Sequence, residues 1–170
     1  MGYPAACSKL EMRYAVSICG RFRSRWGAKQ FKVLTKVFEY GYATRETGII
    51  YSKGLDEHGV NTIYCYADSV HSLPRSQGCT ICMMNGGAIT ATSKKHTITA
   101  NSTCHDELIE FWRAGNKVAG LRNIQSEMGM HPEAPSVIYQ DNQAAIQIEM
   151  NRGSLGEHSR HISRKVLSSR

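Results

Sequence analysis

Hydrophobic and polar residues recur with two different periods along the chain, and each change of period marks a new element. We predict helices over residues 10–24 and 28–41. In the second, Phe31, Leu34, Val37 and Phe38 recur at the spacing of one helix face, and the lysines fall elsewhere. A turn-rich break from Gly41 to Gly48 follows these helices.

After this break the pattern becomes that of strands. We predict short strands in GIIYS (48–52) and in NTIYCYAD (61–68), the second of which ends at Asp68. Two further runs, GCTICMM and AITATS, flank Asn85-Gly86-Gly87. Because Asn and Gly tolerate positive φ, this tripeptide predicts a β-hairpin.

The helical period returns from Ser102 to Gly129 and predicts one long amphipathic helix, with Ser102 or Thr103 as its N-cap. Two prolines punctuate the loop that follows. We predict a strand over residues 136–140, a helix over residues 142–150, and a polar, basic tail.

Strand, hairpin, long helix and strand, in this order, indicate an α/β domain that begins near residue 47. A helical crossover places the strands before and after it parallel to each other. Asp68 and Asp141 would then lie at the carboxyl ends of these strands, where ligands of such sheets bind. Glu107 can reach the same point from the first turns of the long helix.

Three carboxylates that converge in a water-accessible cleft repel one another unless a cation joins them. Mg²⁺ or Mn²⁺ is the expected cation because both prefer oxygen ligands. An alternative explains each acid separately: Asp68 caps a turn, Glu107 lies on a solvated helix face, and Asp141 caps the helix that follows it.

The formal net charge of +7 is concentrated near the N-terminus, where residues 1–56 hold ten Lys and Arg against four Asp and Glu. Such an excess favours a polyanionic partner, most often a nucleic acid, although a solvated basic face is the alternative. Our candidate nucleic-acid-binding residues are Arg21, Arg23, Arg25, Lys29, Lys94, Lys95, Asn142 and Arg160.

The six cysteines lack the regular spacing of a disulfide framework, so we expect reduced thiols and an intracellular protein. Cys79 and Cys82 form one C-x-x-C inside a predicted strand, where buried cysteines are the more common explanation. The alternative is a zinc site completed by Cys104 and His105. No apolar run approaches the roughly 20 residues that cross a bilayer, and the N-terminus lacks the features of a secretory signal.

Six blocks of the sequence, in the same order, resemble the ribonuclease H domain of copia-type long-terminal-repeat retrotransposons and the end of the reverse-transcriptase region before it. They are RYAVSICGRF (13–22), FKVLTKVFEYGYATRETGIIYSKG (31–54), RSQGCTICMMNGGAITATSKKH (75–96), ANSTCHDELIEF (100–111), VIYQDNQAAI (137–146) and HSRHIS (158–163).

This resemblance implies a ribonuclease H-like fold, with a five-stranded mixed sheet flanked by helices. Residues 1–46 would form a helical extension, and residues 47–170 the ribonuclease H-like domain. The implied activity is hydrolysis of the RNA strand of an RNA–DNA hybrid with two Mg²⁺ ions. The implied catalytic and metal-binding residues are Asp68, Glu107 and Asp141.

The chain also departs from the family's pattern. Ser163 stands where the family supplies a fourth carboxylate, and DSVHS (68–72) replaces the usual Asp-Ala-Asp-Trp-Ala. A neutral hydroxyl cannot replace a carboxylate as a strong Mg²⁺ ligand, which predicts a weakened metal site. His158 or His161 is a candidate proton carrier, and a surface or phosphate-contacting role is the alternative.

These departures favour a retrotransposon-derived domain whose catalysis is impaired. It would now act as an RNA- or protein-binding scaffold in a larger assembly, such as a ribonucleoprotein or an organellar complex. The alternative is an active, Mg²⁺-dependent ribonuclease H of a copia-type reverse transcriptase.

Overall fold

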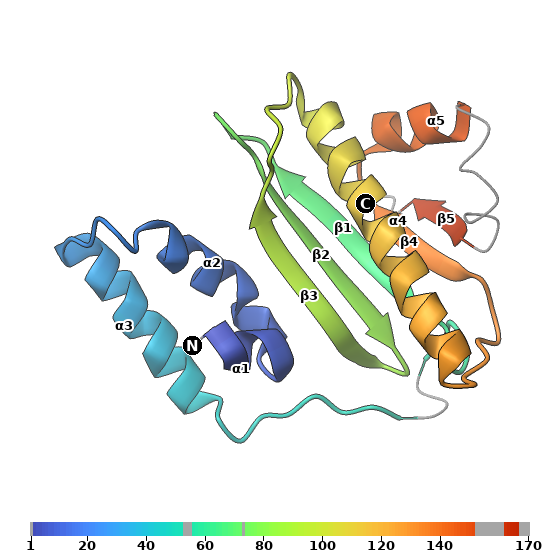
Figure 1. Ribbon diagram of the computed structural model, residues 1–170, viewed down its shortest axis with the longest axis horizontal. Helices are drawn as coiled ribbons and strands as arrows, with labels where there is room; N and C mark the ends of the chain where they lie inside the picture. Colours follow the sequence, from blue (N-terminus) through green and yellow to red (C-terminus); the bar gives the residue numbers. More distant parts are fainter. Residues whose placement is uncertain (1, 53–55, 73, 152–161, 167–170) are drawn as a thin grey trace.

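A computed structural model describes residues 2–52, 56–72, 74–151 and 162–166 of the chain. Its centre is one mixed β-sheet with the strand order β3-β2-β1-β4-β5 (Figure 1). The strands are β1 (Tyr64–Val70), β2 (Gln77–Met84), β3 (Gly87–Lys95), β4 (Ser136–Gln140) and β5 (Ile162–Val166).

The pairing of the strands follows the predicted crossover. β1, β2 and β3 form an antiparallel meander, whereas β4 pairs with β1 in parallel and β5 pairs with β4 in parallel. The side chains of β1 to β4 are described, and β5 is described by its backbone pairing. The prediction of a mixed α/β sheet flanked by helices is confirmed.

Five α-helices and a short 3₁₀ helix, η1, accompany the described strands. The helices are α1 (Gly2–Cys7), η1 (Leu10–Met12), α2 (Arg13–Arg21), α3 (Ala28–Ala43), α4 (Thr103–Glu127) and α5 (Gln143–Asn151). The expected helix over residues 10–24 is therefore shorter and begins as a 3₁₀ turn. In α4, the Ser102 hydroxyl accepts a hydrogen bond from the backbone N–H of His105, which confirms Ser102 as the N-cap.

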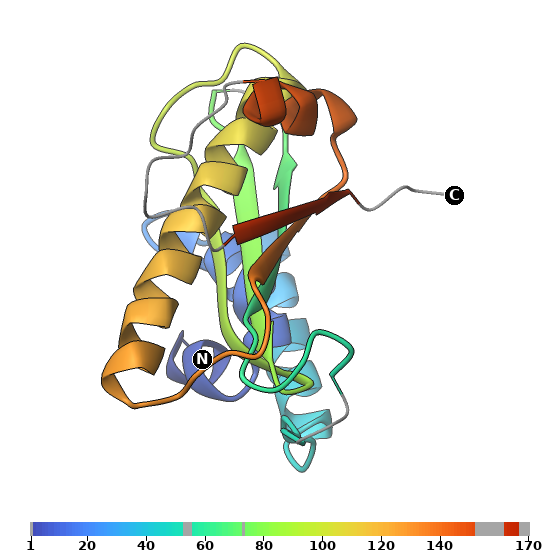
Figure 2. The ribbon, with the colours of Figure 1, turned by 90° about the vertical axis from the view of Figure 1, so that its right-hand side faces the viewer.

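The main core lies between the sheet and α4, which crosses one face of β1 and β2 (Figures 1 and 2). Apolar side chains of the central strands meet one stripe of the helix there. The fully buried members of this core include Ile63, Cys65, Cys82, Ala114, Val118 and Ile138. This packing fixes the position of α4, and so of Glu107, against β1.

The helices before residue 46 form a second, smaller core that contains Met12, Cys19 and Val37. α2 lies beside β3 (Figure 1), and the side-chain amide of Gln77 on β2 donates to Ser17 on α2 over 3.4 Å. The helical character of this segment agrees with the sequence. Its division from residues 47–170 as a separate extension stays a prediction.

Two predicted strand limits are wrong. Residues 48–52 are not a strand, because the backbone N–H of Ser52 donates to Asn85 O at the hairpin without a ladder of further pairs. The other error concerns β1, which continues to Val70 because Ser69 and Val70 still pair with β2. Asp68 therefore lies inside β1 and not at its end.

The predicted hairpin between β2 and β3 is confirmed. Asn85 has a φ of 51° and Gly86 a φ of 77°, the positive values that these residues tolerate best. Gly129 has a φ of 68° and ends α4 where the sequence predicted a stop.

The expectation of reduced thiols is wrong for one pair. Cys65 and Cys82 lie opposite each other in the β1–β2 register, with Cα atoms 4.1 Å apart, and form a disulfide. Side chains three residues apart on a strand point to opposite faces, so Cys79 cannot join Cys82 in chelating one ion. Among the described residues, no Cys–His group has the geometry of a zinc site.

None of the helices in the described segments is both long enough and apolar enough to cross a bilayer.

Candidate metal centre

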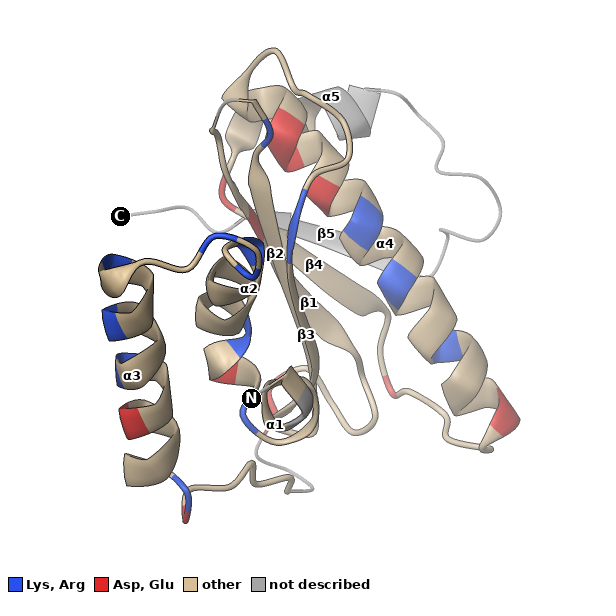
Figure 3. Cartoon of the chain, turned by 60° about the vertical axis from the view of Figure 1, so that its left-hand side comes forward, with Lys and Arg blue, Asp and Glu red and all other residues tan. Residues whose placement is uncertain are grey.

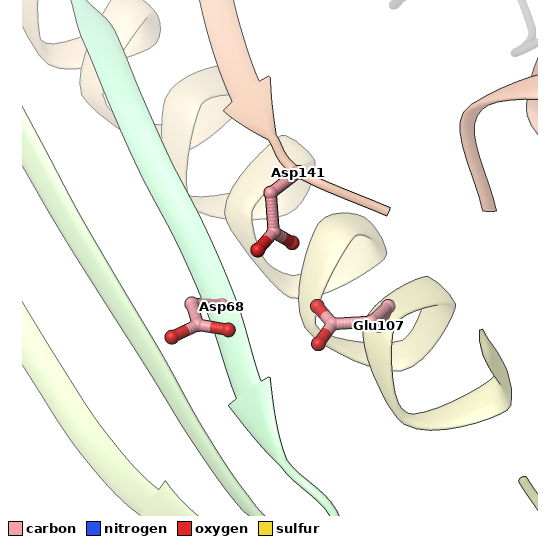
Figure 4. A group of neighbouring side chains, drawn as sticks. All are labelled: Asp68, Glu107 and Asp141. Carbon is pink, nitrogen blue, oxygen red and sulfur yellow. The ribbon is translucent and has the colours of Figure 1, made fainter. Parts of the chain in front are cut away.

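Three carboxylates from three different elements meet at one edge of the sheet (Figure 4). Asp68 comes from β1, Glu107 from the second turn of α4, and Asp141 directly follows β4. One carboxylate oxygen from each residue lies within 4.8 Å of the other two. The structure thus brings together the three acids that the sequence singled out, while their catalytic role stays a prediction.

The separate explanations for these acids do not fit the structure. Asp68 lies within a strand and caps no turn, and Glu107 is only 6% exposed. Asn142, not Asp141, caps α5, because its side-chain oxygen accepts from the backbone N–H of Ala145 over 3.0 Å. None of the three therefore has the structural role that would explain it alone.

Glu107 is held by neutral donors from both neighbouring strands. The backbone N–H of Ser69 donates to Oε1 over 3.3 Å, and the Gln140 side chain donates to Oε2 over 2.8 Å. Burial raises the pKa of Glu107, the hydrogen bonds from Gln140 and Ser69 oppose this shift, and the charge of Asp68 adds to it. The carboxylate is thus oriented, but its negative charge is not neutralised by these donors.

The donor set fits a hard divalent cation. All three ligand groups are carboxylates, and Asp68 and Asp141 are exposed on the solvent side, where water can complete the shell. Mg²⁺ requires near-octahedral oxygen coordination and usually keeps several waters. No Cys or His of the described segments belongs to this group, which also disfavours zinc.

A buried polar network lies directly behind the acids and was not predicted from the sequence. Asp106, the residue before Glu107, is fully buried and accepts from the Ser76 hydroxyl over 2.5 Å. Ring nitrogens of His71 and His96 lie 2.5 Å and 3.0 Å from its carboxylate oxygens. Burial raises the pKa of Asp106, but the hydrogen bonds from Ser76, His71 and His96 outweigh this and lower it overall.

The same network continues to Glu110, one turn further along α4. Glu110 is 3% exposed, accepts from the Thr80 hydroxyl over 2.5 Å, and lies 3.2 Å from His96 Nε2. His96 therefore joins two carboxylates of α4 to the end of β3. In the sequence, all the acids in the first turns of this helix look solvent-exposed. No sequence signal therefore showed that Asp106 and Glu110 are buried in a network, whereas Glu107 belongs to the candidate metal centre.

Several predicted site residues remain untested by the structure. His158, Arg160 and His161 lie outside the described residues. The backbone register pairs Ser163 with Val137, four residues before Asp141 along β4. At about 3.3 Å per residue this is about 13 Å from the level of Asp141. The role of position 163 as a fourth ligand site stays a prediction that this register does not favour.

The basic candidates fall into two groups. Arg21, Arg23, Arg25 and Lys29 are exposed around the connection from α2 to α3 (Figure 3). Lys94 and Lys95 end β3, with side chains directed to opposite faces of the sheet. β2 and β3 separate α2 from the strand that carries Asp68. The first group and the acids therefore form different parts of the surface.

Asn142, another candidate for nucleic-acid contact, has a structural role at the start of α5. Replacing it with Ala should lower the free energy of unfolding by about 1 kcal/mol, because one backbone N–H loses its cap. Asn142→Ser keeps a capping oxygen and should lower the free energy of unfolding by only a few tenths of 1 kcal/mol. Urea unfolding of both variants checks this, and equal losses would contradict the capping role.

No protein-family model matches the chain. Among solved structures, the chain is similar to ribonuclease H1 from the archaeon Halobacterium salinarum NRC-1, with 10% identity over 62% of this chain and 85% of that one, at a TM-score of 0.44. It is similar to Marinitoga piezophila Argonaute in complex with guide RNA and target DNA, with 16% identity over 81% of this chain and 20% of that one, at a TM-score of 0.41.

It is also similar to Ciona intestinalis endonuclease V in complex with DNA, with 10% identity over 64% of this chain and 46% of that one, at a TM-score of 0.31.

Proposed function

We propose that this chain is a ribonuclease H-like nuclease domain that binds a divalent cation between Asp68, Glu107 and Asp141 and cuts the RNA strand of an RNA–DNA hybrid. One observation supports the proposal above all others. Three acids that are distant in sequence present oxygens within 4.8 Å of one another, without a role in capping or in a described ion pair.

The three acids have different roles in the proposed site because their burial differs. Glu107 is fixed by Ser69 and Gln140, so it provides an oriented ligand at the rear of the site. Asp68 and Asp141 face solvent, where a phosphodiester can approach them. Mg²⁺ bound there would supply positive charge to the phosphate oxygens and to the attacking water.

The choice of an RNA–DNA hybrid rests on the resemblance of six sequence blocks to copia-type ribonuclease H domains. The same resemblance supports an origin in a copia-type retrotransposon polyprotein. An intracellular site of action is a separate proposal that rests on the spacing of the cysteines. The geometry of the acids alone is compatible with cutting any nucleic-acid backbone.

The experiment is incubation of the chain with three end-labelled duplexes of one sequence: RNA–DNA, RNA–RNA and DNA–DNA. Each is tested with Mg²⁺ and with Mn²⁺. Cleavage restricted to the RNA of the hybrid supports the proposal. A folded chain that leaves all three duplexes intact with both ions would refute it.

A second candidate function is RNA binding without cleavage, in a scaffold of a larger assembly. Two observations favour it: Ser163 replaces the acid that the resemblance expects, and exposed arginines gather at the α2–α3 connection. In this case binding depends on the arginines and not on the acids.

Neutralising Arg21, Arg23, Arg25 and Lys29 together to Gln tests this candidate. If all four residues contact phosphates, the slope of log affinity for single-stranded RNA against log salt falls in magnitude by about 3. Arg45→Gln, which removes an exposed cation paired with Glu46, is the control and should leave the slope unchanged. Fluorescence anisotropy at several salt concentrations measures both, and an unchanged slope in the fourfold variant excludes this binding face.

A further inference from the structure

A groove of about 230 Å³ lies between β3 and α4, and it shares Thr80 and Glu110 with the buried network. We name it the cationic groove; it is lined by Thr80, Thr92, Lys94, Glu110, Arg113 and Lys117. Three of these side chains are cations, and they come from two different elements. Figure 3 shows basic positions along α4 and at the end of β3.

Lys117 is the less exposed of the two lysines that line the groove. It is partly buried, and its ammonium donates to the Thr92 hydroxyl over 2.6 Å. Among the residues that the structure describes, no carboxylate forms an ion pair with Lys117. Burial lowers the pKa of Lys117, Glu110 opposes this shift, and the charge of Arg13 on α2 adds to it.

The one acid of the groove is already satisfied. Glu110 lies almost fully buried in the wall, where the Thr80 hydroxyl occupies one oxygen and His96 and Arg113 approach the other. Arg113 reaches it with a single nitrogen over 3.4 Å, although a guanidinium carries five donors. One carboxylate, paired with Arg113, offsets only one of the three positive charges of the groove.

The groove also holds hydrogen-bond donors that can bind the oxygens of an anion. The Thr92 hydroxyl accepts from Lys117, which leaves its own proton to donate elsewhere. An ammonium has three donors, and Thr92 accepts one of them. A tetrahedral anion at this place would meet Lys117, Arg113, Thr92 and the exposed Lys94.

We propose that the cationic groove binds a phosphate group, with Lys117 and Arg113 as the main ligands and Thr92 and Lys94 in support. The phosphate belongs to a nucleic-acid backbone or to a free phosphate ion. The first source rests on the proposed function, because the groove would then be a second contact site for the nucleic-acid strand that reaches the three acids. The anion site itself does not rest on the proposed function.

The test uses the full chain without divalent cations, so that the three acids take no part. Inorganic phosphate is titrated at constant ionic strength against chloride, and the midpoint of thermal unfolding is recorded. A ligand that binds only the folded state raises this midpoint with its concentration. Lys117→Gln should weaken phosphate binding about 10-fold, the loss expected for one charge-assisted contact.

Two further variants make the comparison specific. Lys94→Gln removes an exposed cation of the groove, whereas Lys95→Gln makes the same change on the opposite face of the same strand. The first should weaken phosphate binding and the second should not. In chloride, Lys117→Gln should unfold at no lower temperature than the native chain, because the substitution removes a partly buried cation that has no ion-pair partner among the described residues.

The source of the phosphate is read from a parallel titration with a short RNA–DNA hybrid. Weaker hybrid binding by Lys117→Gln, together with weaker phosphate binding, indicates a backbone phosphate. A loss confined to inorganic phosphate indicates the free ion, and both results support the site. Phosphate binding that is absent from the native chain, or unchanged in Lys117→Gln, overturns it. Cleavage of a hybrid by a chain with no phosphate site would leave the proposed function intact.

Discussion

Asp68→Asn should abolish hybrid cleavage, with a fall in rate of at least about 10³-fold. The substitution keeps the size of the side chain but removes one of three carboxylates that lie within 4.8 Å. An amide is a weaker ligand for Mg²⁺, and the remaining two acids hold the cation less firmly. Asp141→Asn should have the same effect, because Asp141 is exposed at the end of β4 in an equivalent position.

A second readout separates loss of the site from loss of the fold. Mg²⁺ should raise the unfolding midpoint of the native chain but not that of Asp68→Asn. Without Mg²⁺ the variant should be at least as stable as the native chain, since the repulsion between neighbouring carboxylates is reduced.

Glu127→Gln is the matched control for charge, because Glu127 is an exposed acid at the end of α4, far along the helix from Glu107. It should leave both cleavage and the Mg²⁺ effect unchanged. Substantial cleavage by both Asp68→Asn and Asp141→Asn would exclude the metal-dependent mechanism.

Gly78→Ala should lower the free energy of unfolding by about 3 kcal/mol. A Cβ at this position would lie 1.9 Å from Glu110 Oε2 and 2.5 Å from His96 Nε2. The Glu110 carboxylate cannot move aside without leaving its buried partners, and breaking a buried charged pair costs about 3–5 kcal/mol. Strand propensity alone predicts the opposite sign, because a glycine in a strand interior is unfavourable.

Urea unfolding measures this difference, and Gly115→Ala provides the control. Gly115 lies within α4, and a Cβ there would meet nothing within 4 Å. Its replacement should stabilise the chain by about 0.5–1 kcal/mol. In a Glu110→Ala background, Gly78→Ala should cost less, since the Glu110 oxygen that the Cβ meets is gone and only the contact with His96 Nε2 remains. A loss below about 1 kcal/mol in the native background would contradict the close packing.

The buried network beside Gly78 lies next to both the candidate metal centre and the cationic groove. Asp106 and Glu110 bind His96 from one side of α4, while Glu107 faces β1 and β4 from the other. The network therefore holds α4 against the end of β3 within one turn of Glu107. The cationic groove shares Glu110 with this network and so lies on the same rigid support.

The elements were predictable where local signals agree with the packing. The α4 cap at Ser102, the Asn85-Gly86 turn and strand β4 were confirmed, because capping, positive φ and β-branched residues act within a few positions. The segment at residues 48–52 was not predictable in this way. It has the composition of a strand, yet a strand also requires a partner over several residues.

The candidate site, too, was predictable from the sequence only in part. The sequence alone predicted that Asp68, Glu107 and Asp141 stand near the ends of elements joined by a crossover, and a parallel crossover brings such positions to the same end of the sheet. Only the tertiary structure decided that Asp106 and Glu110 are buried beside His96, that Cys65 pairs with Cys82, and that Lys117 faces Lys94. These contacts depend on strand register and on the rotation of α4, and both are set by packing between residues that are distant along the chain.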